Sequence, residues 1–164
     1  MNFESSFAYR GRPGIQEGKD LERGILGKPV ESIDDAAYAS CKEAMNEVLD
    51  ADPGKLSETM ATLKSRVFNN INPKSGFIKV RSALGTSLDL YHGVDAVMEY
   101  EGRIATIDIT SNIEKAATGA KADIVLYATL DDDGMPTVDE GIMEQAAADI
   151  SRLLLGESDL KRAA

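Results

Sequence analysis

Two aspartates that lie among apolar residues are the strongest candidates for chemistry in this sequence. Residues 92–110 read HGVDAVMEYEGRIATIDIT, and the apolar alternation on both sides of Glu101-Gly102 predicts a β-hairpin that turns there. In a hairpin closed at that turn, Asp95 lies near Asp108. The sequence therefore predicts two neighbouring carboxylates on adjacent strands.

Two carboxylates on facing strand positions repel each other, so their placement needs a physical reason. A divalent cation between them would make the pair favourable, and Mg²⁺ is commonly held by one or two carboxylates together with water and substrate phosphate. We therefore expect Asp95 and Asp108 to form a site for Mg²⁺ or Mn²⁺. The simpler interpretation is that both side chains face solvent, where a strand aspartate is harmless.

The rest of the sequence predicts the elements that must position the two aspartates. Apolar residues at helical spacing and helix-capping patterns predict helices over 32–50, 56–70, 111–119 and 137–155. Extended apolar runs predict strands over 77–84, 94–100, 103–110 and 122–130, with a loop over 85–93. This order predicts an α/β fold in which a mixed four-stranded sheet is flanked by helices.

A single domain is expected, because the chain has 164 residues. We place this α/β domain over residues 32–156. Residues 1–31 are rich in Gly, Pro and charge, and we expect an N-terminal arm or irregular segment there. Residues 157–164 are expected to be a frayed tail.

The hairpin resembles the PD-(D/E)xK nuclease superfamily, with Asp95 in its first strand and Asp108-Ile109-Thr110 in its second. The resemblance covers about residues 33–130 and includes the order of the elements. It implies a restriction-endonuclease-like core (αβββαβ) and a Mg²⁺-dependent nuclease that acts on DNA. It also implies that Asp95, Asp108 and the backbone carbonyl of Ile109 hold the metal, which activates a water for attack on a phosphodiester.

The sequence departs from the superfamily pattern at position 110. The motif lysine, which positions the water and stabilises developing charge, is replaced by Thr110, whose hydroxyl carries no positive charge. Either another lysine supplies that charge or the site is inactive. Lys115 is the first substitute that the sequence offers, and Lys121 is the second.

Four further side chains near the predicted site carry possible roles. Glu43 and Glu47 lie one turn apart in the first predicted helix and are extra metal ligands or plain surface acids. His92, the only histidine, is a phosphate ligand or proton carrier, or simply an exposed loop residue. Asp89 is an additional ligand or a turn-forming residue.

Composition narrows the class of protein. The net charge is −10, which argues against tight, nonspecific binding of DNA, because such binding requires cations that replace counterions on phosphates. Half of that excess lies in residues 132–164, which hold 8 acidic and 3 basic residues. The single cysteine, Cys41, is predicted on an apolar helix face and cannot form an internal disulfide, which favours a reducing compartment.

A cytoplasmic protein that does not enter a membrane is expected, since no apolar run approaches spanning length and the first residues lack the apolar core of a signal peptide. Three functions are consistent with the sequence. The first is the Mg²⁺-dependent nuclease. The second is a catalytically inactive nuclease-fold protein of phage or bacterial origin that serves in binding or assembly. The third is an acidic interaction protein unrelated to nucleases. The N-terminal arm is of a kind that reaches onto a neighbouring subunit, so a homo-oligomer is expected under the first two.

Overall fold

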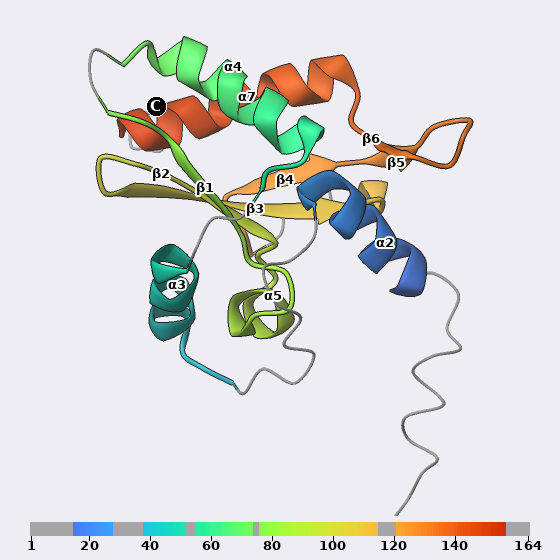
Figure 1. Ribbon diagram of the computed structural model, residues 1–164, viewed down its shortest axis with the longest axis horizontal. Coiled ribbons are helices and arrows are strands. Elements are labelled where there is room, and N and C mark those ends of the chain that lie inside the picture. Colours follow the sequence, from blue (N-terminus) through green and yellow to red (C-terminus); the bar gives the residue numbers. More distant parts are fainter. Residues whose placement is uncertain (1–14, 28–37, 52–54, 74–75, 115–120, 157–164) are drawn as a thin grey trace, which may run out of the picture.

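Four strands form the central sheet of the computed structural model (Figure 1). The structure describes residues 15–27, 38–51, 55–73, 76–114 and 121–156. The strands are β1 (Lys79–Ser82), β2 (Ala96–Tyr100), β3 (Arg103–Thr110) and β4 (Ile124–Tyr127), in the spatial order β1-β2-β3-β4. The first three are antiparallel neighbours, and β4 pairs in parallel with β3. The predicted mixed four-stranded α/β sheet is thus confirmed.

The larger core lies between one face of the sheet and three helices. These are α2 (Ile15–Leu26), α4 (Glu58–Ile71) and α7 (Glu140–Leu155). Figure 1 shows α4 and α7 side by side across this face. As the sequence predicted, α4 turns Met60, Leu63 and Val67 inward, where they are buried with strand residues such as Met98 and Ile107. These packed side chains hold β2 and β3 in place from this face of the sheet.

The opposite face of the sheet is covered by α3 (Cys41–Asp50) and α5 (Ser87–His92), as Figure 1 shows. The core here is smaller and centres on Ala44 and Val48 of α3, Leu88 of α5 and Val97 of β2. Because side chains alternate across a strand, this is the face toward which even-numbered residues at the end of β3 point.

The helix α3 begins later than the sequence predicted. Its capping box is formed by Ser40 and Glu43, and residues 38–40 are not helical, whereas the sequence pattern indicated a start near residue 32. Residues 28–37 lie outside the described ranges. The buried stripe of α3 consists of Ala44 and Val48, so Cys41 is exposed, and the prediction of an apolar-facing cysteine is wrong.

Two helices occupy segments that the sequence did not predict to be helical. Residues 15–26 were expected to be irregular, but they form α2, which buries Leu21, Ile25 and Leu26. The segment 85–93 was predicted as a loop, but it contains α5, which ends at Gly93 with φ +65°. The apolar pattern of each helix is short and is interrupted or bounded by glycine, so its helical periodicity is weak. Tertiary packing therefore decides the conformation of both segments.

The predicted strand 122–130 is divided in two. β4 ends at Tyr127, and β5 (Thr129–Leu130) instead pairs with β6 (Pro136–Thr137) in a separate two-stranded sheet. The helix predicted over 111–119 lies mostly outside the described residues. Within the described part, 111–114, residues 113–114 are helical. The tail over 157–164 also lies outside the described residues.

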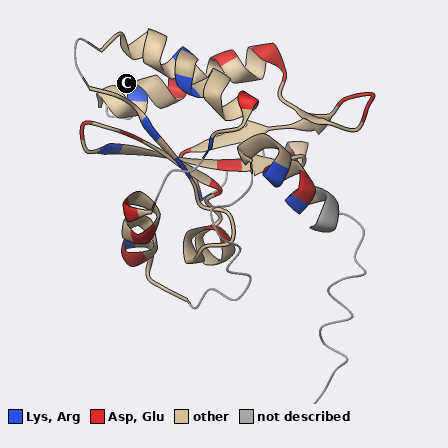
Figure 2. Ribbon diagram, viewed as in Figure 1, with Lys and Arg blue, Asp and Glu red and all other residues tan. Residues whose placement is uncertain are grey.

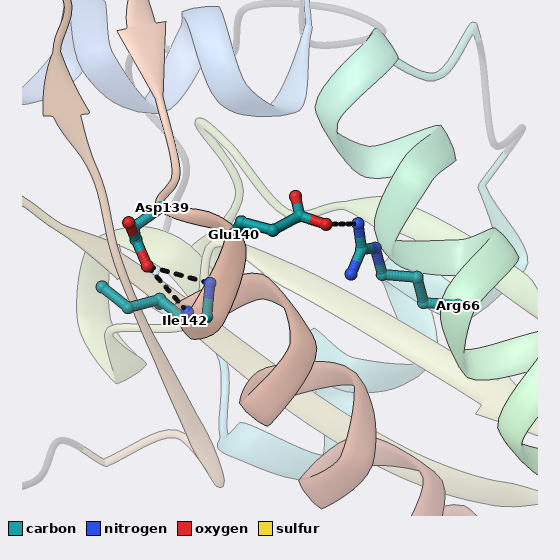
Figure 3. A network of polar contacts seen from close by, with 5 residues as sticks. Arg66, Asp139, Glu140 and Ile142 are labelled. Atoms are coloured by element: carbon teal, nitrogen blue, oxygen red, sulfur yellow. Dashed lines mark hydrogen bonds and ion pairs between the residues drawn. The ribbon is translucent and has the colours of Figure 1, made fainter.

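The start of α7 is fixed by two polar interactions (Figure 3). The side chain of its N-cap, Asp139, accepts hydrogen bonds from the backbone N–H groups of Gly141 and Ile142. Glu140 forms an ion pair with Arg66 of α4, which links the two helices that cover this face. None of the helices in the described ranges is long and apolar enough to cross a membrane.

Candidate metal centre

Asp95 and Asp108 lie opposite each other at one end of the hairpin. The register of β2 and β3 pairs Ala96 with Ile107, and the backbone N–H of Asp95 donates to the carbonyl of Ile107 at 2.8 Å. Continuing this register by one residue places Asp95 opposite Asp108, with both side chains on the face covered by α3 and α5. Each residue is only 3% exposed. The structure thus brings the two carboxylates together and places them out of solvent.

Asp95 is held by the backbone on both sides. Its carboxylate Oδ2 accepts a hydrogen bond from the N–H of Ile109 at 2.6 Å, and its carbonyl accepts from the N–H of Ala83 at 2.7 Å. The Ile109 carbonyl, which the sequence prediction also assigns to the metal, belongs to the residue whose N–H holds this carboxylate.

Burial changes the protonation of this cluster. The pKa of Asp95 is raised to about 8, first by desolvation and then by the negative charges of Glu22, Asp108 and Asp89, against the lowering effect of the Ile109 N–H. A buried carboxylate with acidic neighbours is unfavourable unless a cation compensates its charge. Without a cation, the proton on Asp95 supplies that compensation near neutral pH.

Asp89 belongs to the same cluster through α5. Its Oδ2 accepts from the N–H of Gly85 at 2.8 Å. Burial raises the pKa of Asp89, while the Gly85 N–H, a hydrogen bond with the side chain of Asp95 and the charge of Lys19 lower it. Sequence reasoning treated Asp89 as an optional ligand in a loop, and the helix α5 is what carries it to the aspartate pair.

The helix α2 adds two charges to the site that the sequence pattern does not predict. Glu22 raises the pKa of Asp95, and Lys19 lowers that of Asp89, which shares a hydrogen bond with Asp95, so both charges act on this cluster. Lys19 and Glu22 are three residues apart, which places them on neighbouring positions of one helix surface. The signal in the sequence was the pair Leu21 and Ile25, which have helical spacing but lie in a segment that also contains Gly18 and Gly24.

Thr110 occupies the position of the motif lysine and is 8% exposed. Its Oγ1 accepts from the N–H of Asn112 at 3.1 Å, and its carbonyl accepts from the N–H of Ala128. Lys115, the predicted substitute, lies outside the described residues, and Lys121 is exposed. Among the described lysines, Lys19 is one whose charge acts on the cluster.

The remaining candidates have structural partners. Glu43 accepts from the backbone N–H of Ser40 at 3.0 Å and completes the cap of α3, while Glu47 is exposed on the same helix. His92 ends α5, and its Nε2 lies 2.9 Å from the carbonyl of Ala39. In the conformation described, and within the described ranges, no three His, Cys, Asp or Glu side chains are arranged to hold a metal ion.

The donor set nevertheless fits a hard cation. Two buried carboxylates and a nearby backbone carbonyl are oxygen donors, and Mg²⁺ needs only one or two carboxylates because water and phosphate complete its octahedron. A separate open pocket of about 390 Å³ lies between β4 and α7 and is lined by Asp123, Asp139 and Asp149 among others. Asp123 and Asp139 are exposed and Asp149 is half-buried, so their charges do not need a cation to offset burial, as those of Asp95 and Asp108 do. The aspartate pair is thus the better metal candidate.

Comparison of the chain with protein-family models, with curated proteins and with solved structures gave no match.

Proposed function

We propose that this chain is a Mg²⁺- or Mn²⁺-dependent phosphodiesterase that acts on DNA, with Asp95 and Asp108 as the metal-holding pair. The observation that carries the proposal is the burial of both carboxylates, each 3% exposed, at facing positions of adjacent strands. Such a pair is costly without a counterion. The arrangement of a three-stranded antiparallel meander followed by a parallel strand agrees with the αβββαβ core of the PD-(D/E)xK superfamily and supports the same proposal.

Each residue of the site has a proposed role. Asp95 and Asp108 hold the cation, and the Ile109 carbonyl is the third protein donor. The Ile109 N–H holds the Asp95 carboxylate in place. When bound, the cation lowers the pKa of a coordinated water and offsets the charge that develops on the leaving oxygen. The burial of the pair keeps these charges in a medium of low dielectric, where their interaction with the cation is strong.

A positive charge at the nucleophilic water must come from a residue other than Thr110, which has none. Lys115 remains the candidate that follows from the sequence. Lys19 is the candidate among the described residues, because its charge already acts on Asp89. A comparison of Lys19→Ala with Lys115→Ala would separate them, since only the lysine that serves the water should lower the rate when removed.

The direct test is a cleavage assay on labelled single-stranded DNA, duplex DNA and RNA with Mg²⁺ or Mn²⁺. We expect metal-dependent cleavage of DNA that falls by about 100-fold or more in Asp95→Asn and Asp108→Asn, as removal of a metal ligand should. Glu47→Gln is the matched control, because Glu47 is an exposed acid on the helix that covers the same face. Absence of cleavage in every substrate, with the wild type equal to Asp108→Asn, would reject the proposed activity.

A second candidate is a nuclease-fold protein that binds or assembles without catalysis. Thr110 in place of the motif lysine favours it, and so does the net charge of −10. This candidate predicts that Mg²⁺ or Mn²⁺ leaves the melting temperature of the wild type unchanged and that no substrate is cleaved. The expected homo-oligomer belongs to this candidate as well as to the first. It rests on the N-terminal arm predicted over residues 1–31, of which residues 1–14 lie outside the described ranges.

A further inference from the structure

Three aromatic rings gather at the surface near the end of α5. The rings of Tyr38 and Tyr91 meet edge to face with centroids 5.4 Å apart, and the ring of His92 lies 5.9 Å from that of Tyr38. Tyr38 is 69% exposed and Tyr91 is 45% exposed, and Leu90 beside them is also exposed. Large aromatic side chains clustered in solvent typically mark a binding surface.

The backbone that carries Tyr38 is fixed to α5 by two hydrogen bonds. The N–H of Ala39 donates to Oγ of Ser87 at 2.9 Å, and the carbonyl of Ala39 lies 2.9 Å from Nε2 of His92. Ser87 is 2% exposed, so the first bond is protected from water. Both polar groups of the residue next to Tyr38 are thus engaged, and the ring is held against Tyr91 before any ligand arrives.

The aromatic pair lies on the outer side of the helix that reaches the aspartate pair. Asp89 shares a hydrogen bond with the side chain of Asp95, and Tyr91 follows two positions later, about 200° around the helix. A helix with its side chains is about 10 Å across. Two or three nucleotides of one strand cover that distance at roughly 3.4 Å each.

The charges of this face do not favour recognition through phosphates. The two cations of β1 have other partners, because Lys79 pairs with Glu99 and Nε of Arg81 donates to the carbonyl of Ala51. Acidic residues outnumber the single cation, Lys42, on helix α3, where Figure 2 shows red segments. A nucleic acid bound here must gain affinity from its bases, and stacking on aromatic rings supplies such affinity without cations.

From this arrangement we propose that Tyr38 and Tyr91 stack an unpaired base of the substrate strand next to the aspartate pair, so that the substrate class is single-stranded DNA or a single-stranded end. This inference rests on the proposed function, and it deepens that function by naming the form of DNA. Bases in a duplex are already stacked on one another and offer no free face, so the tyrosine pair favours unpaired strands.

The test is binding of a fluorescein-labelled oligothymidylate, measured by anisotropy with EDTA present so that no cleavage takes place. An abasic oligonucleotide of equal length and a blunt duplex serve as comparison probes. We expect Tyr38→Ala and Tyr91→Ala each to weaken binding of the oligothymidylate by roughly 5- to 100-fold. Tyr91→Phe keeps the ring and should bind like the wild type. The abasic strand and the duplex should bind weakly and respond little to any of these changes.

Phe77→Ala is the matched control, because Phe77 is an aromatic side chain of similar exposure (68%) at the other end of the sheet face. Thermal melts verify that the exposed-site variants remain folded. Equal affinity of the wild type and Tyr38→Ala/Tyr91→Ala for the oligothymidylate would overturn the proposal. So would a change of oligomeric state in these variants with unchanged oligonucleotide binding, because the pair would then contact a second copy of the chain.

The two proposals fail in different ways. If the tyrosine variants weaken binding of the unpaired strand but the wild type cleaves nothing with Mg²⁺ or Mn²⁺, the base-stacking surface stands and the catalytic proposal does not. If cleavage depends on Asp108 while binding is independent of both tyrosines, the catalytic proposal stands and the base-stacking surface does not.

Discussion

At the residue scale, the burial of Asp95 creates the energetic problem that a cation would solve. Its carboxyl group is 3% exposed and has acidic neighbours on three elements, so the folded protein holds a proton there up to a pKa of about 8. An unfolded chain releases that proton near 3.8. Between these two values the folded state binds more protons than the unfolded state.

The free energy of unfolding should therefore fall as pH rises from about 4 to about 8. A rise in pH favours the state that binds fewer protons, which in this range is the unfolded state. Asp95→Asn cannot lose a proton and keeps a carbonyl oxygen for the Ile109 N–H. We expect it to be more stable than the wild type near pH 8, by on the order of a few kcal/mol. Its pH profile should also be flatter, with a residual slope from Asp89, whose pKa burial raises as well.

Urea unfolding at several pH values between these limits, without divalent ions, measures the difference. Glu47→Gln should follow the wild-type profile, because Glu47 is exposed. Parallel profiles for Asp95→Asn and the wild type would show that Asp95 is not the buried titrating group.

At the scale of elements, the packing of α2 determines how close Lys19 and Glu22 lie to Asp89 and Asp95. The helix packs on β6 so closely that a Cβ added at Gly24 would lie 2.3 Å from Cγ of Pro136. Gly18, in the same helix, has nothing within 4 Å of its added Cβ. A substitution at Gly24 therefore tests the packing of α2 against β6, whereas a substitution at Gly18 tests the helix propensity of α2.

We expect Gly24→Ala to destabilise the protein by about 1–3 kcal/mol, because α2 must move away from β6. Gly18→Ala should stabilise it by up to about 1 kcal/mol, because alanine favours a helix over glycine. Thermal or urea unfolding of both variants gives the comparison. If both substitutions stabilise the protein, the close contact between α2 and β6 does not form.

The elements that the sequence predicted well are those with long, regular patterns. Met60, Leu63 and Val67 predicted α4, and the alternation around Glu101-Gly102 predicted the hairpin with its register. α2 and α5 were missed because each buries only two or three side chains, and local sequence cannot show the surface onto which they pack. Asp95 and Asp108 could thus be paired from sequence, whereas the approach of Glu22 and Lys19 could not.

At the scale of the whole molecule, charge and architecture limit what the protein can bind. The net charge of −10 gives a phosphate backbone little attraction, and the acidic cluster adds to the repulsion. The proposed cation at the aspartate pair and the exposed rings at α5 would each reduce this repulsion locally. The fold places both on the same face of the sheet, which the sequence order of its elements did not reveal, because α5 was read as a loop.

The most direct test of the account is equilibrium binding of Mn²⁺, followed by the electron paramagnetic resonance signal of the free ion at a pH above the raised pKa of Asp95. We expect the wild type and Glu47→Gln to bind Mn²⁺, and Asp108→Asn to lose that binding. Asp95→Asn should lose it as well. Retention of wild-type Mn²⁺ affinity by Asp108→Asn, or no binding by the wild type, would contradict a metal centre built on these two carboxylates.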